Sequence, residues 1–371
     1  MAFRAFQKGG HIDSLLFAAV FLLVVVGLVM LVSASSELGV KRFGDPYYYL
    51  KQQLYKGILP GAVFFVVALF VYYRVYQKLA LALFLISLFL ALLVFSPLGH
   101  SSGGSERWLA LGGPITFQPA ELMKITFVLY LAAWLSNPRT NRRGSLFEGL
   151  LPLVLVTALA AGILVIQPAT STVAILVASG IAMYFLAGAK LRYVTFMVCA
   201  CATGLVLLIL FAGGYRLDRV KTFLGIGTDP LRDGYHVSEA VTTIGSGGLT
   251  GMGFGQSPAK SGRLPAVVND SIFAIIASEF GFLGSAVIVS LFGFLVTRML
   301  ILARRMRDTF GRLVLAGFGV IIGIQVFVHI AALSGTLPLT GIPLPFISLG
   351  GTAMVVFLTM MGISLNISKY A

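Results

Sequence analysis

Ten long apolar runs constrain this chain more than any other feature of its sequence. Each is close to the 20 or so residues that an α-helix needs to cross the roughly 30 Å hydrocarbon core of a bilayer. Because backbone in lipid must satisfy its own hydrogen bonds, the runs predict an all-α, polytopic integral membrane protein with about ten transmembrane helices in a single membrane domain. The single domain covers residues 1–371. The ten runs centre on residues 14–34, 52–73, 77–96, 118–136, 147–167, 170–188, 192–213, 271–299, 312–334 and 348–367.

The composition supports a membrane protein. Hydrophobic residues make up 58% of the chain and charged residues 11%, whereas soluble domains carry about a quarter charged residues. The first apolar run is too long for the core of a signal peptide and lacks a convincing cleavage site, so we expect it to remain as the first span. Cys199 and Cys201 lie at i and i+2 in an apolar run, and we predict no disulfide between them.

The net charge of +14 would suit a nucleic-acid ligand, but the placement of the basic residues indicates membrane orientation instead. Most of them lie in short loops beside the apolar runs, where they mark the cytoplasmic side. With ten spans, both termini are then cytoplasmic, and the long polar segment 215–270 lies on the outer face. Contact with anionic lipid or a phosphorylated lipid substrate is the second role open to these charges.

The segment 215–270 is the only long polar stretch in the chain. Loops of this length in compact folds are usually functional or disordered. Six glycines crowd residues 245–255, and three interpretations stay open: a backbone cradle for a phosphate, a flexible hinge, or small residues that pack a re-entrant segment. They are not a dinucleotide-binding fingerprint, because no βαβ unit surrounds them.

Asp270 ends this segment, where the eighth span begins. One interpretation makes it the N-cap of that helix, as the middle residue of Asn269-Asp270-Ser271. The other makes it a general base, because its carboxylate would lie at the outer edge of a membrane cavity. Glu279 lies about 13 Å deeper on the helix and about 180° round it, so it cannot form an acid–base pair with Asp270. We predict a structural or network-forming role for Glu279.

Two polar pairs lie inside apolar runs. Glu121 and Lys124 share one face of the fourth span, either as a structural ion pair or as a functional site reached from an outer cavity. Gln325 and His329 share a face of the ninth span, where an interhelical hydrogen bond is favoured for His329 over a catalytic role.

The outer segments add further candidates. The basic residues expected to contact a phosphate are Lys41 and Arg42 in the first outer segment and Arg216 and Arg219 after the seventh span. Residues 97–116 are rich in glycine and serine and predict a loop. Residues 335–352 hold three prolines and several glycines, which predict a partly unwound segment that lines a cavity rather than facing lipid.

Together these motifs resemble the SEDS family (shape, elongation, division and sporulation), to which RodA and FtsW belong. The resemblance covers nearly the whole chain, and its most specific parts are QPAELMK at 118–124 and PLTGIPLPFISLGGT at 338–352. FGDPYYYL and GMGFGQS slightly favour the FtsW-like division branch, while DGYHV favours elongation. Further matches are FGDPYYYLKQQ at 43–53, Arg107-Trp108, Tyr215-Arg216 with Arg219, DGYH at 233–236, IGSGGLTGMGFG at 244–255, Lys260, Leu264-Pro265, Asp270 and LNIS at 365–368.

The resemblance implies a peptidoglycan glycosyltransferase that polymerises lipid II on the outer face of the bacterial cytoplasmic (inner) membrane, in division or elongation. It implies a class B penicillin-binding protein as partner, with other divisome or elongasome membrane proteins and no nucleic acid. The family's loop aspartate corresponds to Asp270, which we expect to be the general base of an inverting reaction. No cofactor or metal site is expected, with a dependence on divalent cations left open. The residues expected to bind substrate are Lys41, Arg42, Arg107, Glu121, Lys124, Arg216, Arg219, Lys260 and Ser348.

The chain also departs from the family pattern. Ala169 stands where an acid is usual, Ser271 where a phenylalanine is usual, and Ser278 where the first acid of a Glu-Glu pair is usual. His329 stands where an asparagine is usual. The chain therefore has fewer of the family's acidic residues, which makes Asp270 a stronger candidate for the catalytic role. A flippase or transporter of a lipid-linked precursor is the main alternative function, and a scaffold that only activates its partner is another.

Overall fold

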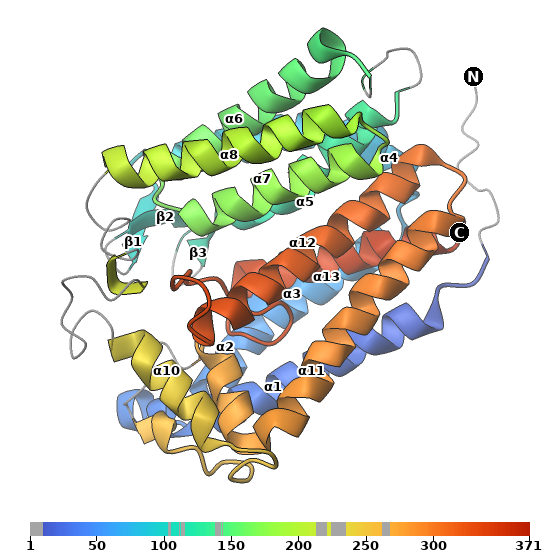
Figure 1. The fold of residues 1–371 in the computed structure, drawn as a ribbon. Helices are drawn as coiled ribbons and strands as arrows, with labels where there is room; N and C mark the ends of the chain where they lie inside the picture. Colours follow the sequence, from blue (N-terminus) through green and yellow to red (C-terminus); the bar gives the residue numbers. More distant parts are fainter. Residues whose placement is uncertain are drawn as a thin grey trace.

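The computed structural model describes residues 10–371, apart from 103–104, 111, 113–115, 138–141, 143, 213–220, 224–234 and 262–267; for 101–102, 105–106, 205, 207–212 and 261 the description is limited to the backbone. The helices of Figure 1 are α1 (Ser14–Phe43), α2 (Tyr48–Gln53), α3 (Leu59–Phe70), α4 (Arg74–Leu93), α5 (Pro119–Leu135), α6 (Leu151–Ile166), α7 (Thr170–Leu186), α8 (Leu191–Ala212), α10 (Tyr235–Ser246), α11 (Ile272–Arg305), α12 (Thr309–Leu333) and α13 (Gly351–Ser368). Two π-helical turns, Leu54–Ile58 and Leu146–Leu150, lead into α3 and α6, and a 3₁₀ turn spans Pro258–Ser261.

Each predicted apolar run contains a helix. In the described part of the chain, seven helical segments are long and apolar enough to cross a membrane, and α7 and the first part of α8 are apolar but shorter. The helix α5, which lies in the fourth apolar run, is not among the seven: it has 17 residues and carries Glu121 and Lys124. The prediction of a multi-pass, all-α membrane protein is confirmed, and the number of ten spans is approximate.

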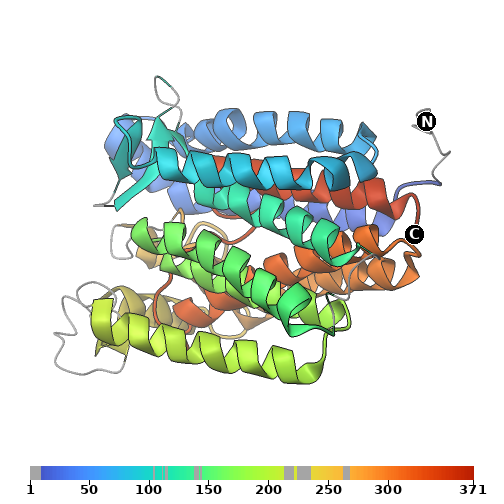
Figure 2. The same ribbon diagram turned by 90° about the horizontal axis from the view of Figure 1, so that it is seen from above.

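The helices run side by side along one broad direction (Figures 1 and 2). The start of α1 and the end of α13 meet at one end of the bundle, where the Gly10 amide donates to the Lys369 carbonyl at 2.8 Å. The opposite end carries α10 and a small sheet (Figure 1). The described residues of the polar segment that precedes α11 therefore lie at the end of the bundle away from the termini.

The small sheet was not expected from the sequence. Its antiparallel strands are β1 (Gly99–Ser102), β2 (Ser105–Ala110) and β3 (Thr116–Phe117), in the order β1-β2-β3. Residues 97–116 were predicted to be a loop, because β1 is built of glycine, serine and histidine rather than the β-branched and aromatic residues that favour strands. Cross-strand backbone pairing overrides that weak propensity and places Arg107 and Trp108 at this end of the bundle.

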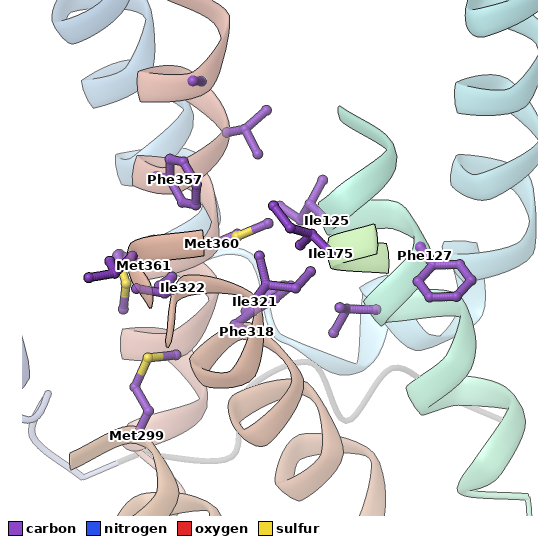
Figure 3. Close-up of a cluster of buried hydrophobic side chains, with 14 of the residues drawn as sticks. Ile125, Phe127, Ile175, Met299, Phe318, Ile321, Ile322, Phe357, Met360 and Met361 are labelled. Atoms are coloured by element: carbon purple, nitrogen blue, oxygen red, sulfur yellow. The ribbon is translucent and has the colours of Figure 1, made fainter. Parts of the chain in front are cut away.

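The helix α13 lies at the centre of the core. Of its most apolar 18-residue window, 83% is buried, as expected of a helix that is apolar all round. Figure 3 shows part of this core, with side chains from α5, α7, α11, α12 and α13. The labelled ones are Ile125, Phe127, Ile175, Met299, Phe318, Ile321, Ile322, Phe357, Met360 and Met361.

The glycine run packs against a break in α11. The backbone of α11 is non-helical at Gly281 (φ 66°, ψ −164°), which only glycine adopts readily. The Met252 and Gly253 amides donate to the carbonyls of residues 278 and 279, each at 3.0 Å. The described contacts of the run are thus those of small residues packing closely, the third of the three interpretations.

Gly251 gives a test of this packing. Its φ is +85°, and a Cβ there would collide with the Glu279 carbonyl. Left-handed strain and displaced backbone together predict that Gly251→Ala lowers the free energy of unfolding by roughly 2 kcal/mol or more. Gly245→Ala is the control, because Gly245 is helical and a Cβ there meets nothing within 4 Å. Thermal unfolding in nanodiscs compares the two, and a wild-type transition in Gly251→Ala would contradict the close contact.

Candidate active site

The connection between α12 and α13, residues 334–350, contains no helix, as the prolines and glycines predicted. Side chains from neighbouring helices satisfy its carbonyls. Ser171 Oγ donates to the Thr340 carbonyl at 2.8 Å, and Gln325 Nε2 donates to the Pro343 carbonyl at 2.8 Å. His329 Nδ1 lies 2.7 Å from the Ile342 carbonyl. The polar face of α12 thus replaces hydrogen bonds that a continuous helix would have made.

The end of this connection fixes the turn that precedes α11. The Leu349 amide donates to the Val268 carbonyl at 2.9 Å, and the Gly350 amide donates to Gln53 Oε1 at 3.0 Å. Ser348, predicted to bind substrate, is buried and its Oγ accepts from the Leu344 amide at 2.8 Å. Its observed contact supports the connection, and its substrate contact stays a prediction.

Asp270 lies directly before α11 and lines a cavity. The N-cap position of α11 is Ser271, which makes no side-chain cap bond, so the N-cap interpretation of Asp270 is wrong. Ser271 Oγ instead lies 2.8 Å from His236 Nε2. Asp270, His236 and His329 line one cavity of about 390 Å³ together with residues of the 338–342 connection. This places a carboxylate where a ligand entering at this end of the bundle would meet it.

A second cavity, also of about 390 Å³, lies on the other side of the turn. Asn269 lines it, with Lys56, His100, Trp108 and the 349–352 segment at the start of α13. Adjacent residues of one turn therefore face two cavities. Lysine, histidine and the amide end of a helix all suit an anion.

Arg107, on β2, is electrostatically coupled to Asp270. Burial lowers the pKa of the Arg107 guanidinium, and the carboxylate of Asp270 opposes that effect. Arg107 Nε is buried without a hydrogen-bond partner in the described structure. The predicted association of Arg107 with the site is therefore supported by its proximity to Asp270. A positive charge here is available to a phosphate.

The Glu121–Lys124 ion pair is present and enclosed. Lys124 Nζ lies 2.7 Å from Glu121 Oε1, and the two side chains are 0% and 4% exposed. Lys124 also donates to Gln325 Oε1 at 2.8 Å and lies 5.5 Å from the centre of the Phe357 ring. Gln325 connects the pair to the unwound segment. This geometry is compatible with both predicted roles of the pair, a structural ion pair and a functional site.

Lys260 lies in a second buried ion pair. Its ammonium pairs with Glu279 and donates to Ser33 Oγ at 2.6 Å, and the Ser33 hydroxyl lies within 2.8 Å of both Glu279 oxygens. The structural role predicted for Glu279 is what the structure shows. Lys260, predicted to bind substrate, has its charge neutralised here, so this geometry gives that prediction no support. The cluster joins the polar segment to α1 and α11.

The remaining basic candidates lie away from the cavities or outside the described residues. Lys41 and Arg42 lie exposed in the last turn of α1, where Lys41 is 3.9 Å from Glu37. Neither belongs to the described lining of either cavity. Arg216 and Arg219 fall in 213–220, outside the described residues. The phosphate contacts assigned to all four stay predictions.

Sequence reasoning missed three residues that line the cavities: Lys56, His100 and His236. His100 was not singled out as a site residue, because no metal-ligand spacing surrounds it, and His236 was noted only as part of a motif. For Lys56 the sequence held one signal, a lysine inside an apolar run. The structure adds that it lies in the π-helical turn Leu54–Ile58, a feature frequent at functional sites.

Comparison with known proteins identifies the family of this chain. The family model FTSW_RODA_SPOVE, described as "Cell cycle protein", matches residues 13–371. The probable peptidoglycan glycosyltransferase FtsW of Geobacter sp. (strain M18) is 34% identical over 357 residues, which are 96% of this chain and 96% of that protein. Stage V sporulation protein E of Bacillus subtilis (strain 168) is 36% identical over 362 residues, 97% of each chain.

Solved structures give the same result. A chain in the structure described as "Structural coordination of polymerization and crosslinking by a peptidoglycan synthase complex" has a TM-score of 0.79 at 27% identity, covering 96% of this chain and 97% of that chain. The Rod shape determining protein RodA of Thermus thermophilus has a TM-score of 0.70 at 27% identity, covering 96% of each chain. Because the family model spans nearly the whole chain and the relatives match over nearly their full lengths, the chain belongs to the cell cycle protein family of FtsW, RodA and SpoVE.

Proposed function

We propose that this chain is a peptidoglycan glycosyltransferase that polymerises lipid II, with Asp270 as the general base. The observation that carries the proposal is the place of Asp270: its carboxylate lines a cavity at the end of the bundle opposite the termini, beside a second cavity lined by basic groups. The relative from Geobacter, similar over nearly the whole chain, is itself named as a probable peptidoglycan glycosyltransferase.

The residues fit a single displacement. Asp270 takes the proton of the acceptor sugar's 4-hydroxyl while that oxygen attacks the anomeric carbon of the donor. The bond from that carbon to the diphosphate oxygen breaks, and the undecaprenyl diphosphate leaves with the electron pair. An α-linked donor then gives a β-linked product by inversion. A direct displacement needs no carboxylate nucleophile, which suits a cavity whose described lining offers Asp270 as its one carboxylate.

The leaving diphosphate needs positive charge. Arg107 is coupled to Asp270, and Lys56 and His100 line the adjacent cavity. We assign the donor diphosphate to this side of the turn, because cations act most strongly on developing negative charge where water is excluded. Lys41, Arg42, Arg216 and Arg219 are kept as proposed contacts for the approaching lipid-linked phosphate.

The membrane setting follows from the same assignment. We place the enzyme in the bacterial cytoplasmic membrane, as one membrane domain with both termini in the cytoplasm and the cavities on the outer side. We propose a class B penicillin-binding protein as its partner, supported by the likeness to a chain of a peptidoglycan synthase complex. No cofactor is assigned to it. A transporter would place its functional acid near the bilayer midplane, whereas Asp270 precedes α11 at the end of the bundle.

The general-base assignment predicts that Asp270→Asn folds but loses polymerisation of lipid II by about a hundredfold or more. The measurement is glycan-strand synthesis by the purified full chain with its partner. Asp45→Asn is the matched control, since Asp45 pairs with Lys51 at the surface at 2.7 Å and its asparagine substitute can still accept from the Tyr47 amide. Glycan synthesis by Asp270→Asn at the level of the control would rule out Asp270 as the base.

The buried pair in α5 makes a separate prediction. Lys124→Met leaves Glu121 as an uncompensated buried charge, which costs about 3–5 kcal/mol of stability. Adding Glu121→Gln should recover most of that loss, and Lys41→Met, at an exposed pair, should change stability by less than about 1 kcal/mol.

Thermal unfolding and glycan synthesis are measured on the same preparations. Activity restored together with stability in the double variant would assign the pair a structural role. Stability restored without activity would instead assign Lys124 a direct part in binding the substrate.

A further inference from the structure

One ring nitrogen of His329 is buried without a partner. The residue is 2% exposed, and its Nδ1 lies 2.7 Å from the Ile342 carbonyl. Its Nε2 has no hydrogen-bond partner in the described structure. Leaving a buried polar atom unpaired costs about 1–3 kcal/mol, and such atoms are rare enough in native folds to need an explanation.

The partner of Nδ1 determines the chemistry of Nε2. A backbone carbonyl only accepts hydrogen bonds, so Nδ1 must carry the ring hydrogen and donate it to Ile342. In the neutral imidazole the other nitrogen then holds a lone pair. Nε2 is therefore complementary to a hydroxyl or an amide N–H and mismatched to a phosphate oxygen.

His329 lines the same cavity as Asp270. Two hydroxyl groups, those of Thr222 and Thr340, also lie in the described lining, which contains no lysine or arginine. An ionised carboxylate accepts hydrogen bonds only. Asp270 and His329 thus give this cavity two strong acceptors, which suits a neutral ligand rich in hydroxyl and amide donors rather than a diphosphate.

We propose that His329 is a substrate-binding residue: its Nε2 accepts a hydrogen bond from a hydroxyl or acetamido N–H of the acceptor sugar. The inference rests on the proposed function, and it adds a second contact to the sugar that Asp270 activates. Asp270 takes the reacting proton, whereas His329 holds a neighbouring donor without removing its hydrogen. Two fixed contacts orient the attacking hydroxyl, since a single contact leaves the sugar free to rotate.

Two substitutions separate the ring nitrogens. His329→Asn keeps an amide near Nδ1, which can still donate to Ile342, but places no atom at Nε2. His329→Gln places its amide oxygen near Nε2 and loses the Nδ1 donor. The full chain with its transpeptidase partner, in nanodiscs, is assayed with lipid II for KM, kcat and thermal unfolding.

We expect His329→Asn to raise KM for lipid II about tenfold, which corresponds to about 1.4 kcal/mol, with kcat within about threefold of wild type. A higher KM with an unchanged kcat is expected when the lost contact was equally strong in the ground state and in the transition state. His329→Gln should keep KM within about threefold although its unfolding temperature falls. The opposite result, a higher KM for His329→Gln than for His329→Asn, would assign the effect to the hydrogen bond with Ile342 and overturn the proposal.

Wild type and Asp270→Asn in the same assay separate this inference from the proposed function. Absence of glycan synthesis by wild type would overturn both. Synthesis by wild type, loss in Asp270→Asn and an unchanged KM in His329→Asn would overturn the role of His329 alone. If His329→Asn is not recovered folded, His329→Phe, which fills the ring volume without a nitrogen, replaces it in the comparison with His329→Gln.

Discussion

The backbone of the broken segment 334–350 sets the main constraint on this fold. A chain that stops being helical inside an apolar bundle leaves carbonyls that water cannot reach, at a cost of several kcal/mol each. Ser171, Gln325 and His329 supply the donors for three of these carbonyls. Gln325 is held in turn by Lys124. Polar residues of α5, α7 and α12 therefore act together to stabilise the broken segment.

The break places the candidate site. Once residues 338–342 leave the helix, they form one wall of the cavity that Asp270 also lines. The bond from the Leu349 amide to the Val268 carbonyl then fixes the turn at 268–270. On the far side of Asp270, α11 is broken again at Gly281, where the glycine run supplies the missing donors. Asp270 thus lies between two breaks in helical structure, the segment 334–350 and the break at Gly281, and backbone carbonyls at both breaks accept hydrogen bonds from neighbouring segments.

The sequence predicted the helices well and the contacts between them only in part. Apolar length encodes a span directly, which is why the runs and the unwound 335–352 segment were found. The Glu121–Lys124 pair was also predictable, because i and i+3 on a helix are neighbours. The contacts of Lys260 were not foreseen, since its partners, Ser33 and Glu279, are distant in sequence. The sheet was missed because pairing between strands, rather than local propensity, stabilises it.

Three of the residues that depart from the family pattern form local hydrogen bonds. Ser271 bonds with His236 at 2.8 Å, and Ser278 Oγ lies 3.2 Å from Ser246 Oγ. His329 bonds to the Ile342 carbonyl. Each of these three positions thus keeps a hydrogen-bond partner for its side chain, so the fold around the turn is retained without the usual residues there. The described lining of the cavity is left with one carboxylate, Asp270, and a displacement that inverts the donor carbon in one step requires only that one.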